Sequence, residues 1–319
     1  MSNTITTCEA FAPATIANVI VGFDNLGFAL NTIGDRVRVT KTTDKKIAIT
    51  SIECEKYIEK SILSALPREA HLNTSTAGLI KLQNDLKLPF GFEVHIKKGI
   101  PLGSGLGGSS ASAVATIKAA NHLLPKPLTN EELLSYAVEG ESVASGSSHA
   151  DNVAPCLFGG LTLIRPDQNG VTQIGIPDNL KVVILYPGFR LDTKVAREVL
   201  PDAITLPTHV RASGRLASFI SSCYTQDFNL MRTSLVDEII EPARAHLIPG
   251  FLEVKRVAIE HNAIGCSISG AGPSVFALAH KNEAELICDK MKTEFTKHCK
   301  SPITTWISNI STQGAYILS

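Results

Sequence analysis

Apolar and polar residues alternate strictly over residues 92–97, beginning with Phe92. A period of two is typical of a strand that buries one face. Residues 111–124 are instead rich in helix formers and are followed by Pro125, which indicates a helix. Strand-like and helical periods alternate irregularly along the chain without a fixed repeat, so the pattern predicts a mixed α and β architecture.

A second helix is predicted to begin near Thr129, which forms with Glu132 the spacing of a capping box. Apolar residues then recur with helical spacing, and Glu141 falls on the same stripe, seven residues beyond Leu134. A carboxylate on an inward face is costly unless it is paired or coordinated, and a Mg2+ ion would supply such coordination. The alternative is that the helix frays at Gly140 and leaves Glu141 in solvent.

The composition is that of an ordinary folded protein. The chain has 319 residues, 44% of them hydrophobic, which is enough for a sizeable core. Lys plus Arg (30) equals Asp plus Glu (30), so no excess of charge favours nucleic acid or an anionic membrane as a partner. No apolar run approaches the ~20 residues of a membrane span, and the first ten residues lack the features of a secretion signal. We therefore expect a cytoplasmic protein without a nucleic-acid or membrane partner.

The seven cysteines and nine histidines show no disulfide or metal-binding pattern. No two cysteines form a C-x-x-C pair, and their odd number fits poorly with a secreted disulfide framework. The histidines lack the H-E-x-x-H motif and any Cys/His ligand spacing. The sequence predicts reduced thiols and no zinc site.

Turn-forming residues cluster at 165–170 and at 176–179, close to the middle of the chain. Such clusters are typical of a boundary between domains, although the same residues also form hairpin turns. We predict one domain over residues 1–165 and a second over residues 166–319.

A glycine-rich segment, residues 101–110, lies between the predicted strand and the helix that follows it. Its glycines, four in six residues, let the backbone bring N–H groups close to a ligand. The start of the following helix adds partial positive charge, so phosphate groups can be held there without an excess of basic side chains. The serines of the segment could donate hydrogen bonds or ligate a cation such as Mg2+. The alternative is a tight structural turn.

Gly103, Gly105 and Gly108 also match the G-x-G-x-x-G dinucleotide fingerprint. That fingerprint requires a second parallel strand that ends in an acidic residue about twenty positions later, whereas this chain has Pro125, Pro127 and then another helix. No G-K-[ST] follows the glycines, which excludes the P-loop of the common nucleotide hydrolases. A dinucleotide-dependent oxidoreductase is therefore not favoured.

Two further segments in the first half of the chain place polar side chains among apolar residues. The segment 145–155 contains His149, Asp151 and Asn152, and a run of this kind is typical of an active-site loop or of a capped turn. Near the start of the chain, Asn18 and Asp24 stand in an otherwise apolar stretch. If they point inward they need hydrogen-bonding partners.

In the second half, Arg197 follows Thr193 in a predicted helix, and Arg244 ends the polar segment 241–244. Either arginine alone would ordinarily lie at the surface. Residues 269–274 form a glycine-containing turn between two apolar runs, as a plain hairpin turn would.

Residues 101–109 fit the pattern P-x-x-x-G-L-G-x-S, which resembles the central motif of the GHMP small-molecule kinases, a family named for kinases of galactose, homoserine, mevalonate and phosphomevalonate. The resemblance extends over about residues 10–280, with several motifs in family order. It implies a two-domain α+β fold, with an N-terminal α+β nucleotide-binding domain and a C-terminal ferredoxin-like α+β domain. The segment 269–274 resembles the third motif, which lies against the phosphate loop in the family.

In that family the glycine loop holds the phosphates of ATP, and Mg2+ is the metal. The resemblance makes Glu141 and Ser109 the implied metal ligands. The commoner form of the motif has Ser-Ser-Ala directly after Gly-Leu-Gly, whereas this chain has Gly-Ser-Ser at 108–110, which leaves open which serine contacts the metal or the phosphate. The implied nucleotide-binding residues are Pro101, Gly103, Ser104, Gly105, Leu106, Gly107, Gly108, Ser109 and Ser110.

Glu141 together with residues 149–152 resembles most closely the members of the family that phosphorylate L-homoserine. The resemblance implies transfer of the γ-phosphoryl group of ATP to the hydroxyl of L-homoserine, a step toward threonine, by a homodimer. The implied catalytic residues are Asp151, Asn152 and Thr193. The implied substrate contacts are Asn18, Asp24, His149, Arg197, Arg244, Gly270 and Gly272.

The implied contacts suit an amino acid. Asp24 matches the residue that receives the ammonium group, and Arg197 and Arg244 match those that grip the carboxylate, for which guanidinium forks are suited. The first motif of the family corresponds to residues 18–24 of this chain. Residues 19–21 are Val-Ile-Val where the family has Leu-Gly-Pro, so the backbone of this motif can differ from that of the family. Alternatives are a GHMP relative acting on another alcohol, such as mevalonate, and a non-catalytic ligand sensor of the same fold.

Overall fold

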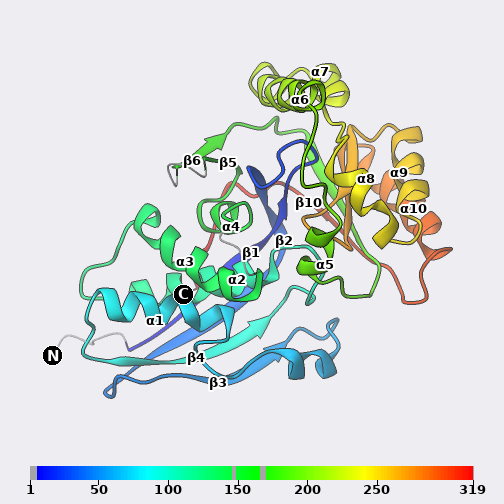
Figure 1. Ribbon diagram of the computed structural model, residues 1–319. Coiled ribbons are helices and arrows are strands. Elements are labelled where there is room, and N and C mark those ends of the chain that lie inside the picture. The colour runs from blue at the N-terminus through cyan, green and yellow to red at the C-terminus, as the bar shows by residue number, and fades with distance from the viewer. Residues whose placement is uncertain (1–5, 146–148, 166–169, 319) are drawn as a thin grey trace.

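The computed structural model describes residues 6–145, 149–165 and 170–318, which form two β-sheets with helices packed on them (Figure 1). The larger sheet has the strand order β11-β1-β2-β4-β3, with β5 beside β2 and β6 beside β5. Neighbouring strands are antiparallel except β3 and β4, which are parallel. The strands are β1 (Thr7–Ala17), β2 (Leu26–Thr42), β3 (Ile47–Cys54), β4 (Gly91–Lys98), β5 (Leu161–Arg165), β6 (Gly170–Ile174) and β11 (Tyr316–Leu318).

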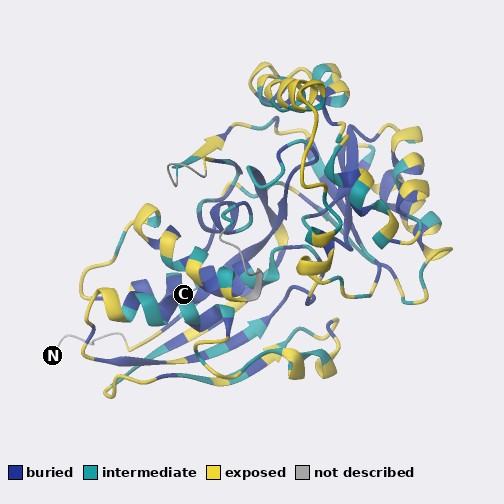
Figure 2. Ribbon diagram, viewed as in Figure 1, coloured by how far each residue is buried: buried dark blue, intermediate teal, exposed yellow. Residues whose placement is uncertain are grey.

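Four helices cover one face of the larger sheet (Figure 1). The central one, α2, is an alanine-rich helix that is buried almost all round between the sheet and its neighbours, as Figure 2 shows. An all-round apolar helix is typical of the interior of a domain. The four are α1 (Thr74–Asp85), α2 (Gly108–His122), α3 (Asn130–Ser145) and α4 (Val153–Phe158), and a 3-10 turn, η1 (Lys60–Ala65), follows β3.

The smaller sheet has the order β10-β7-β9-β8 and is antiparallel throughout. Numbered along the chain this is the order 4-1-3-2 with helices after the first and third strands, which is the ferredoxin-like arrangement that the family resemblance implies. Its strands are β7 (Leu180–Tyr186), β8 (Gly265–Ile268), β9 (Val275–His280) and β10 (Thr304–Ser308). Its helices are α5 (Thr193–Glu198), α6 (Leu206–Thr225), α7 (Phe228–Ser234), α8 (Ile240–Arg244), α9 (Phe251–Glu260) and α10 (Ala284–Thr296), with a 3-10 turn η2 (Ala245–Leu247).

The period of two along β7 divides the core between the two faces of the smaller sheet. Val182 and Ile184 belong to the main core, which they share with the larger sheet. Val183 and Leu185 point to the other face and belong to a second core with α9 and α10. The α+β fold predicted from the sequence is therefore confirmed.

The domain division predicted after residue 165 stays a prediction. The turn residues 166–169 lie outside the described residues, and both β6 and β11 pair within the larger sheet although they follow that point in the chain. Across the part of the chain that the structure describes, no helix is long and apolar enough to cross a membrane.

Local predictions for α3 are also borne out. The Thr129 Oγ1 atom accepts a hydrogen bond from the Glu132 amide (3.3 Å), and Glu132 Oε2 accepts one from the Thr129 amide (2.7 Å), which forms the predicted capping box. The helix continues through Gly140, so the alternative in which it frays there is wrong.

A buried ion pair lies beneath the start of α2. Lys98, the last residue of β4, donates to Asp35 Oδ2, to the Gly108 carbonyl (2.7 Å) and to Ser112 Oγ (2.8 Å). The side chains of Lys98 and Asp35 are 3% and 0% exposed. Asp35 Oδ1 also accepts the amides of Gly99 (2.9 Å) and Ile100. This network holds the backbone on both sides of the loop 101–107, since Gly99 precedes it and Gly108 follows it.

Lys98→Met is expected to lower the free energy of unfolding by about 3–5 kcal/mol, because it leaves the buried Asp35 carboxylate without its cation. Urea denaturation followed by circular dichroism measures the change. Lys81→Met is the matched control, since Lys81 pairs with Asp85 at 3.1 Å on an exposed surface, and such a pair contributes less than about 1 kcal/mol. Equal losses in the two variants would contradict the structural importance of the buried pair.

Candidate active site

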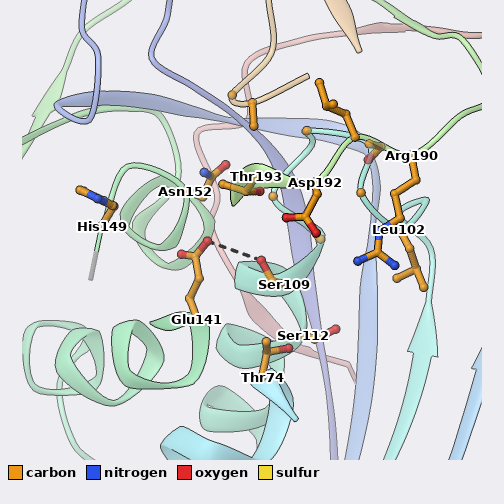
Figure 3. Close-up of a pocket in the computed structure, with 18 of the residues that line it drawn as sticks. Thr74, Leu102, Ser109, Ser112, Glu141, His149, Asn152, Arg190, Asp192 and Thr193 are labelled. Atoms are coloured by element: carbon orange, nitrogen blue, oxygen red, sulfur yellow. Dashed lines mark hydrogen bonds between the residues drawn. The ribbon is translucent and has the colours of Figure 1, made fainter. Parts of the chain in front are cut away.

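A single pocket collects most of the candidate residues from both halves of the chain (Figure 3). It lies where the glycine-rich segment, α3, the N-terminal turn and the start of α5 meet. Four candidates do not line it: Pro101, Leu106, Ser110 and Gly272. The candidates that line it are Asn18, Asp24, Gly103, Ser104, Gly105, Gly107, Gly108, Ser109, Glu141, His149, Asp151, Asn152, Thr193, Arg197, Arg244 and Gly270.

Several glycines of the glycine-rich segment lie where their surroundings leave no room for a side chain. Gly107, the N-cap of α2, has φ of 67°, and a Cβ atom on it would lie 2.0 Å from Thr15 Oγ1. The same Thr15 hydroxyl donates to Asn152 Oδ1 (2.7 Å). No side chain caps the start of α2, and Gly108 and Ser109 line the pocket, so the first N–H groups of this helix could bind an anion there.

The turn at residues 269–274 packs on this segment, as the resemblance implies. Ser269 Oγ donates to the Gly105 carbonyl (2.7 Å), and the Ser274 amide donates to the Ser104 carbonyl (3.1 Å). Gly105, with φ of 78°, could carry no side chain, because a Cβ atom would lie 2.4 Å from the Ser269 carbonyl. The phosphate-loop candidate is thus held between the two sheets.

Glu141 faces the start of α2. Its Oε1 atom lies 3.4 Å from Ser109 Oγ, the contact dashed in Figure 3. Burial raises the pKa of Glu141 to about 7, against the opposing effect of the Ser110 and Ser109 hydroxyls. Ser110 is fully buried and does not line the pocket, whereas Ser109 does. A cation beside Glu141 would favour the charged carboxylate.

An ion cluster forms another part of the pocket wall. Arg197 Nη2 lies 3.1 Å from Asp24 Oδ1, and His149 Nδ1 lies 3.5 Å from Asp24 Oδ2. Burial lowers the pKa of His149, which the charge of Asp24 only partly offsets. His149 is therefore mostly neutral at pH 7, and the Asp24 carboxylate is paired chiefly with Arg197.

Arg244 is almost completely buried behind that cluster, with 3% of its surface exposed. Its Nε donates to the Ala196 carbonyl (2.9 Å) and its Nη1 to the Gly270 carbonyl (2.9 Å). Burial lowers its pKa to about 10, so the guanidinium remains charged at neutral pH. Arg244 and Arg197 both lie over the Phe23 ring, 5.4 and 5.5 Å from its centroid, which brings two cations to one wall.

Asp151 lines the pocket and is 6% exposed. Burial raises its pKa to about 8, and the carboxylates of Glu141 and Asp24 add to the effect. At pH 7 the Asp151 carboxyl therefore holds a proton. Thr193 and Asn152 line the same pocket (Figure 3), with Thr193 at the start of α5.

The first motif, residues 18–24, which differs from the family in sequence, has an unusual backbone conformation. Asn18, Val19 and Ile20 have φ of 71°, 43° and 65°, a left-handed run that is unfavourable for β-branched residues. Asn18 stabilises it with its side chain: Nδ2 donates to the Gly270 carbonyl (3.1 Å), and Oδ1 accepts the Asp24 amide (3.1 Å). The two polar residues of this apolar stretch do find partners, as their inward position requires.

The sequence did not reveal several residues that line the pocket or that hold its lining residues in place. Phe23, Lys98 and Arg190 line the pocket. Glu241 is buried on α8, the helix that carries Arg244. It accepts hydrogen bonds from Lys255 Nζ and from Ser267 Oγ (2.5 Å), and these bonds anchor the helix. A signal was present for Glu241, which stands one turn before Arg244 in a short polar segment.

Comparisons with known proteins agree with this geometry. The family description "GHMP kinases N terminal domain" matches residues 73–160, and "GHMP kinases C terminal" matches residues 219–297. A homoserine kinase of Xylella fastidiosa is 42% identical over 97% of this chain and 94% of its own length. The chain belongs to the GHMP kinase family.

Other known proteins are also similar to this GHMP kinase in sequence or in structure. A homoserine kinase of Chlorobium phaeobacteroides is 43% identical over 98% of this chain and 99% of its own. The crystal structure of homoserine kinase from Cytophaga hutchinsonii has a TM-score of 0.93 and 39% identity, covering 100% of this chain and 99% of that one. A mevalonate kinase of L. major, with a TM-score of 0.72 over 97% and 98% of the two chains but 14% identity, shares the fold. The family resemblance read from the sequence and the two-domain GHMP kinase fold are confirmed.

Gly107→Ala is expected to abolish binding of a non-hydrolysable ATP analogue, measured by calorimetry. The added methyl group would displace the Thr15 hydroxyl and strain a left-handed residue at the start of α2. Gly175→Ala is the control, because a Cβ atom at Gly175 meets nothing within 4 Å. Retention of wild-type affinity by the Gly107 variant would show that nucleotide does not bind at this segment.

Proposed function

We propose that this GHMP kinase is a homoserine kinase, which transfers the γ-phosphoryl group of ATP to the hydroxyl of L-homoserine to give ADP and O-phospho-L-homoserine. The observation that carries the proposal is the pairing of two complementary sites in one pocket. An uncapped helix start suits phosphate, and the same pocket is lined by Asp24, Arg197 and Arg244, which suit a zwitterion.

The nucleotide would lie along the glycine-rich segment. The amides at the start of α2, with Ser104 and Ser109, would hold the phosphates, and the close packing of Gly105 and Gly107 keeps the backbone near them. Apolar side chains line the pocket beside this segment and would accept the base: Ala65, Leu66, Ile96 and Leu102.

The donor set at Glu141 fits Mg2+. Within the described residues, no group of three or more His, Cys, Asp or Glu side chains could hold a metal, but Mg2+ bound to a nucleotide needs only one or two carboxylates besides phosphate and water. Glu141 would supply the carboxylate and Ser109 the hydroxyl. When bound, the ion would neutralise charge on the transferred phosphoryl group.

The amino acid would bind at the ion cluster. Its ammonium group would meet Asp24, held in place by Asn18, and its carboxylate would meet Arg197 and Arg244, with Gly270 and Gly272 in the adjoining turn and His149 beside Asp24. The Asp24 carboxylate is already paired with Arg197, so the zwitterion would insert opposite charges beside an existing pair rather than meet bare charges.

Asp151, Asn152 and Thr193 would surround the reacting hydroxyl. Asn152 is oriented by the Thr15 hydroxyl. Asp151 holds a proton at neutral pH without ligands, so it would act as a base only after nearby cations lower its pKa. Positioning and charge stabilisation therefore carry most of the proposed catalysis. We place the reaction in threonine biosynthesis, in the cytoplasm, and in a homodimer.

The test of this function is ADP release, coupled to NADH oxidation, with Mg-ATP and a panel of L-homoserine, mevalonate and galactose. We expect turnover with homoserine alone, because only homoserine presents both an ammonium group and a carboxylate to the ion cluster. Turnover with mevalonate or galactose but not homoserine would refute the proposed substrate. Stoichiometric ATP binding without any turnover would indicate a ligand sensor.

Arg197→Ala is expected to raise the KM for homoserine about tenfold or more while leaving the KM for ATP within about twofold, because one charged hydrogen-bonding partner of the carboxylate is lost. Steady-state kinetics with each substrate varied in turn measures both constants. Arg211→Ala is the control, since Arg211 pairs with Glu238 on an exposed surface of α6. A parallel rise of both constants would point to lost folding instead of a lost substrate contact.

A further inference from the structure

We propose that Arg190 is a further phosphate-binding residue of the pocket, whose guanidinium binds oxygens of the β- or γ-phosphate of the nucleotide. This assignment rests on the proposed function, because it takes the glycine-rich segment as the nucleotide site. It concerns a residue of the connection between β7 and α5, outside the glycine-rich segment itself.

The side chain of Arg190 packs directly on the glycine-rich segment. A Cβ atom on Gly103 would lie 2.2 Å from Arg190 Cγ and 3.1 Å from its Nε, so the arginine stem occupies the space that the glycine leaves open. The next amide, of Leu191, donates to the Gly103 carbonyl (3.1 Å). Figure 3 shows Arg190 among the residues that line the pocket. Backbone and side chain together place this guanidinium beside the phosphate-loop candidate.

The other cations of the pocket are already engaged by the protein. Lys98 is bound to Asp35, Arg197 to Asp24, and Arg244 to two backbone carbonyls. His149 lies beside Asp24, and burial lowers its pKa. Of the basic side chains that line the pocket, Arg190 is the one for which the described residues provide no hydrogen bond or ion pair.

An unengaged guanidinium at this place meets a need of the site. The chain has no net charge, and the start of a helix supplies only about half an elementary charge, whereas a nucleotide triphosphate carries several negative charges. A guanidinium can bind two phosphate oxygens at once. Arg190 is exposed, so its guanidinium stays hydrated in the protein without ligand and folding costs it little desolvation free energy.

The arginine belongs with the phosphates and not with the amino acid. The residues proposed for the carboxylate, Arg197 and Arg244, share the Phe23 ring, whereas Arg190 contacts Gly103. Loss of its guanidinium should therefore affect nucleotides that carry a β-phosphate and spare those that lack one.

The experiment compares Arg190→Met with the wild-type protein by calorimetry, using AMP, ADP and a non-hydrolysable ATP analogue with Mg2+. Methionine keeps an unbranched stem over Gly103 and removes only the charged group. We expect the Kd values for ADP and the analogue to rise about tenfold or more, as for one charge-assisted hydrogen bond, with AMP changed less than about twofold. Arg190→Lys should fall between the two proteins, because it restores the charge without the fork.

Lys194→Met is the matched control. It removes one positive charge from the exposed start of α5, and Lys194 does not line the pocket. An equal loss in this variant, or an equal loss of AMP affinity by Arg190→Met, would overturn the assignment. Thermal midpoints of all variants are compared with that of the wild type, so that misfolding is recognised.

The two proposals fail in different ways. Unchanged ADP and analogue affinities in Arg190→Met, with normal binding by the wild-type protein, would overturn the role of Arg190 and leave the proposed function standing. A wild-type protein that binds no nucleotide would overturn the proposed function, and the role of Arg190 with it.

Discussion

The pocket depends on the contact between two glycine-containing turns, one from each sheet. The Ser269 hydroxyl and the Ser274 amide donate to the carbonyls of Gly105 and Ser104. This approach is possible only because Gly105 has no side chain, which would lie 2.4 Å from the Ser269 carbonyl. Since one turn belongs to the larger sheet and the other joins β8 to β9, the contact fixes the two sheets relative to each other at the pocket floor.

The same second turn also orders the wall proposed for the amino acid. The Gly270 carbonyl accepts hydrogen bonds from both Asn18 Nδ2 (3.1 Å) and Arg244 Nη1 (2.9 Å). Asn18 in turn holds the Asp24 amide. A shift of this turn would therefore move the proposed phosphate and carboxylate sites together. Phosphoryl transfer requires the acceptor oxygen and the phosphorus in line at short distance, and a turn shared by the two proposed sites would help to maintain that distance.

The sequence predicts the parts of the site that are local in the chain. The strand, glycine-rich segment and helix at 91–122 follow from periodicity and composition, whereas periodicity left open whether Glu141 faces inward or lies at a frayed helix end. Arg197 and Arg244 have no local signal and were found only through the family resemblance, which also supplied the role of Asn18 as a substrate contact. Lys98 was missed because its partner, Asp35, is 63 residues away, and a buried lysine at a strand end has the same local pattern as an exposed one. Leu106 and Ser110 were included although they face the core, because a motif does not separate the positions that touch a ligand from those that pack beneath it.

The electrostatics of the pocket explain how a chain without net charge can attract a polyanion. Burial raises the pKa of Glu141 to about 7 and that of Asp151 to about 8, so at neutral pH the pocket carries less negative charge than its residues suggest. Arg244 keeps its positive charge, because burial lowers its pKa only to about 10. A cation bound beside the Glu141 and Asp151 carboxyls would lower both pKa values and release protons. The carboxyls would therefore become negatively charged only when a metal ion or the substrate ammonium group lies beside them and neutralises that charge. In the proposed complex, protonation of the two buried acids would lessen the repulsion of the nucleotide, and the arginines of the pocket would supply the attraction.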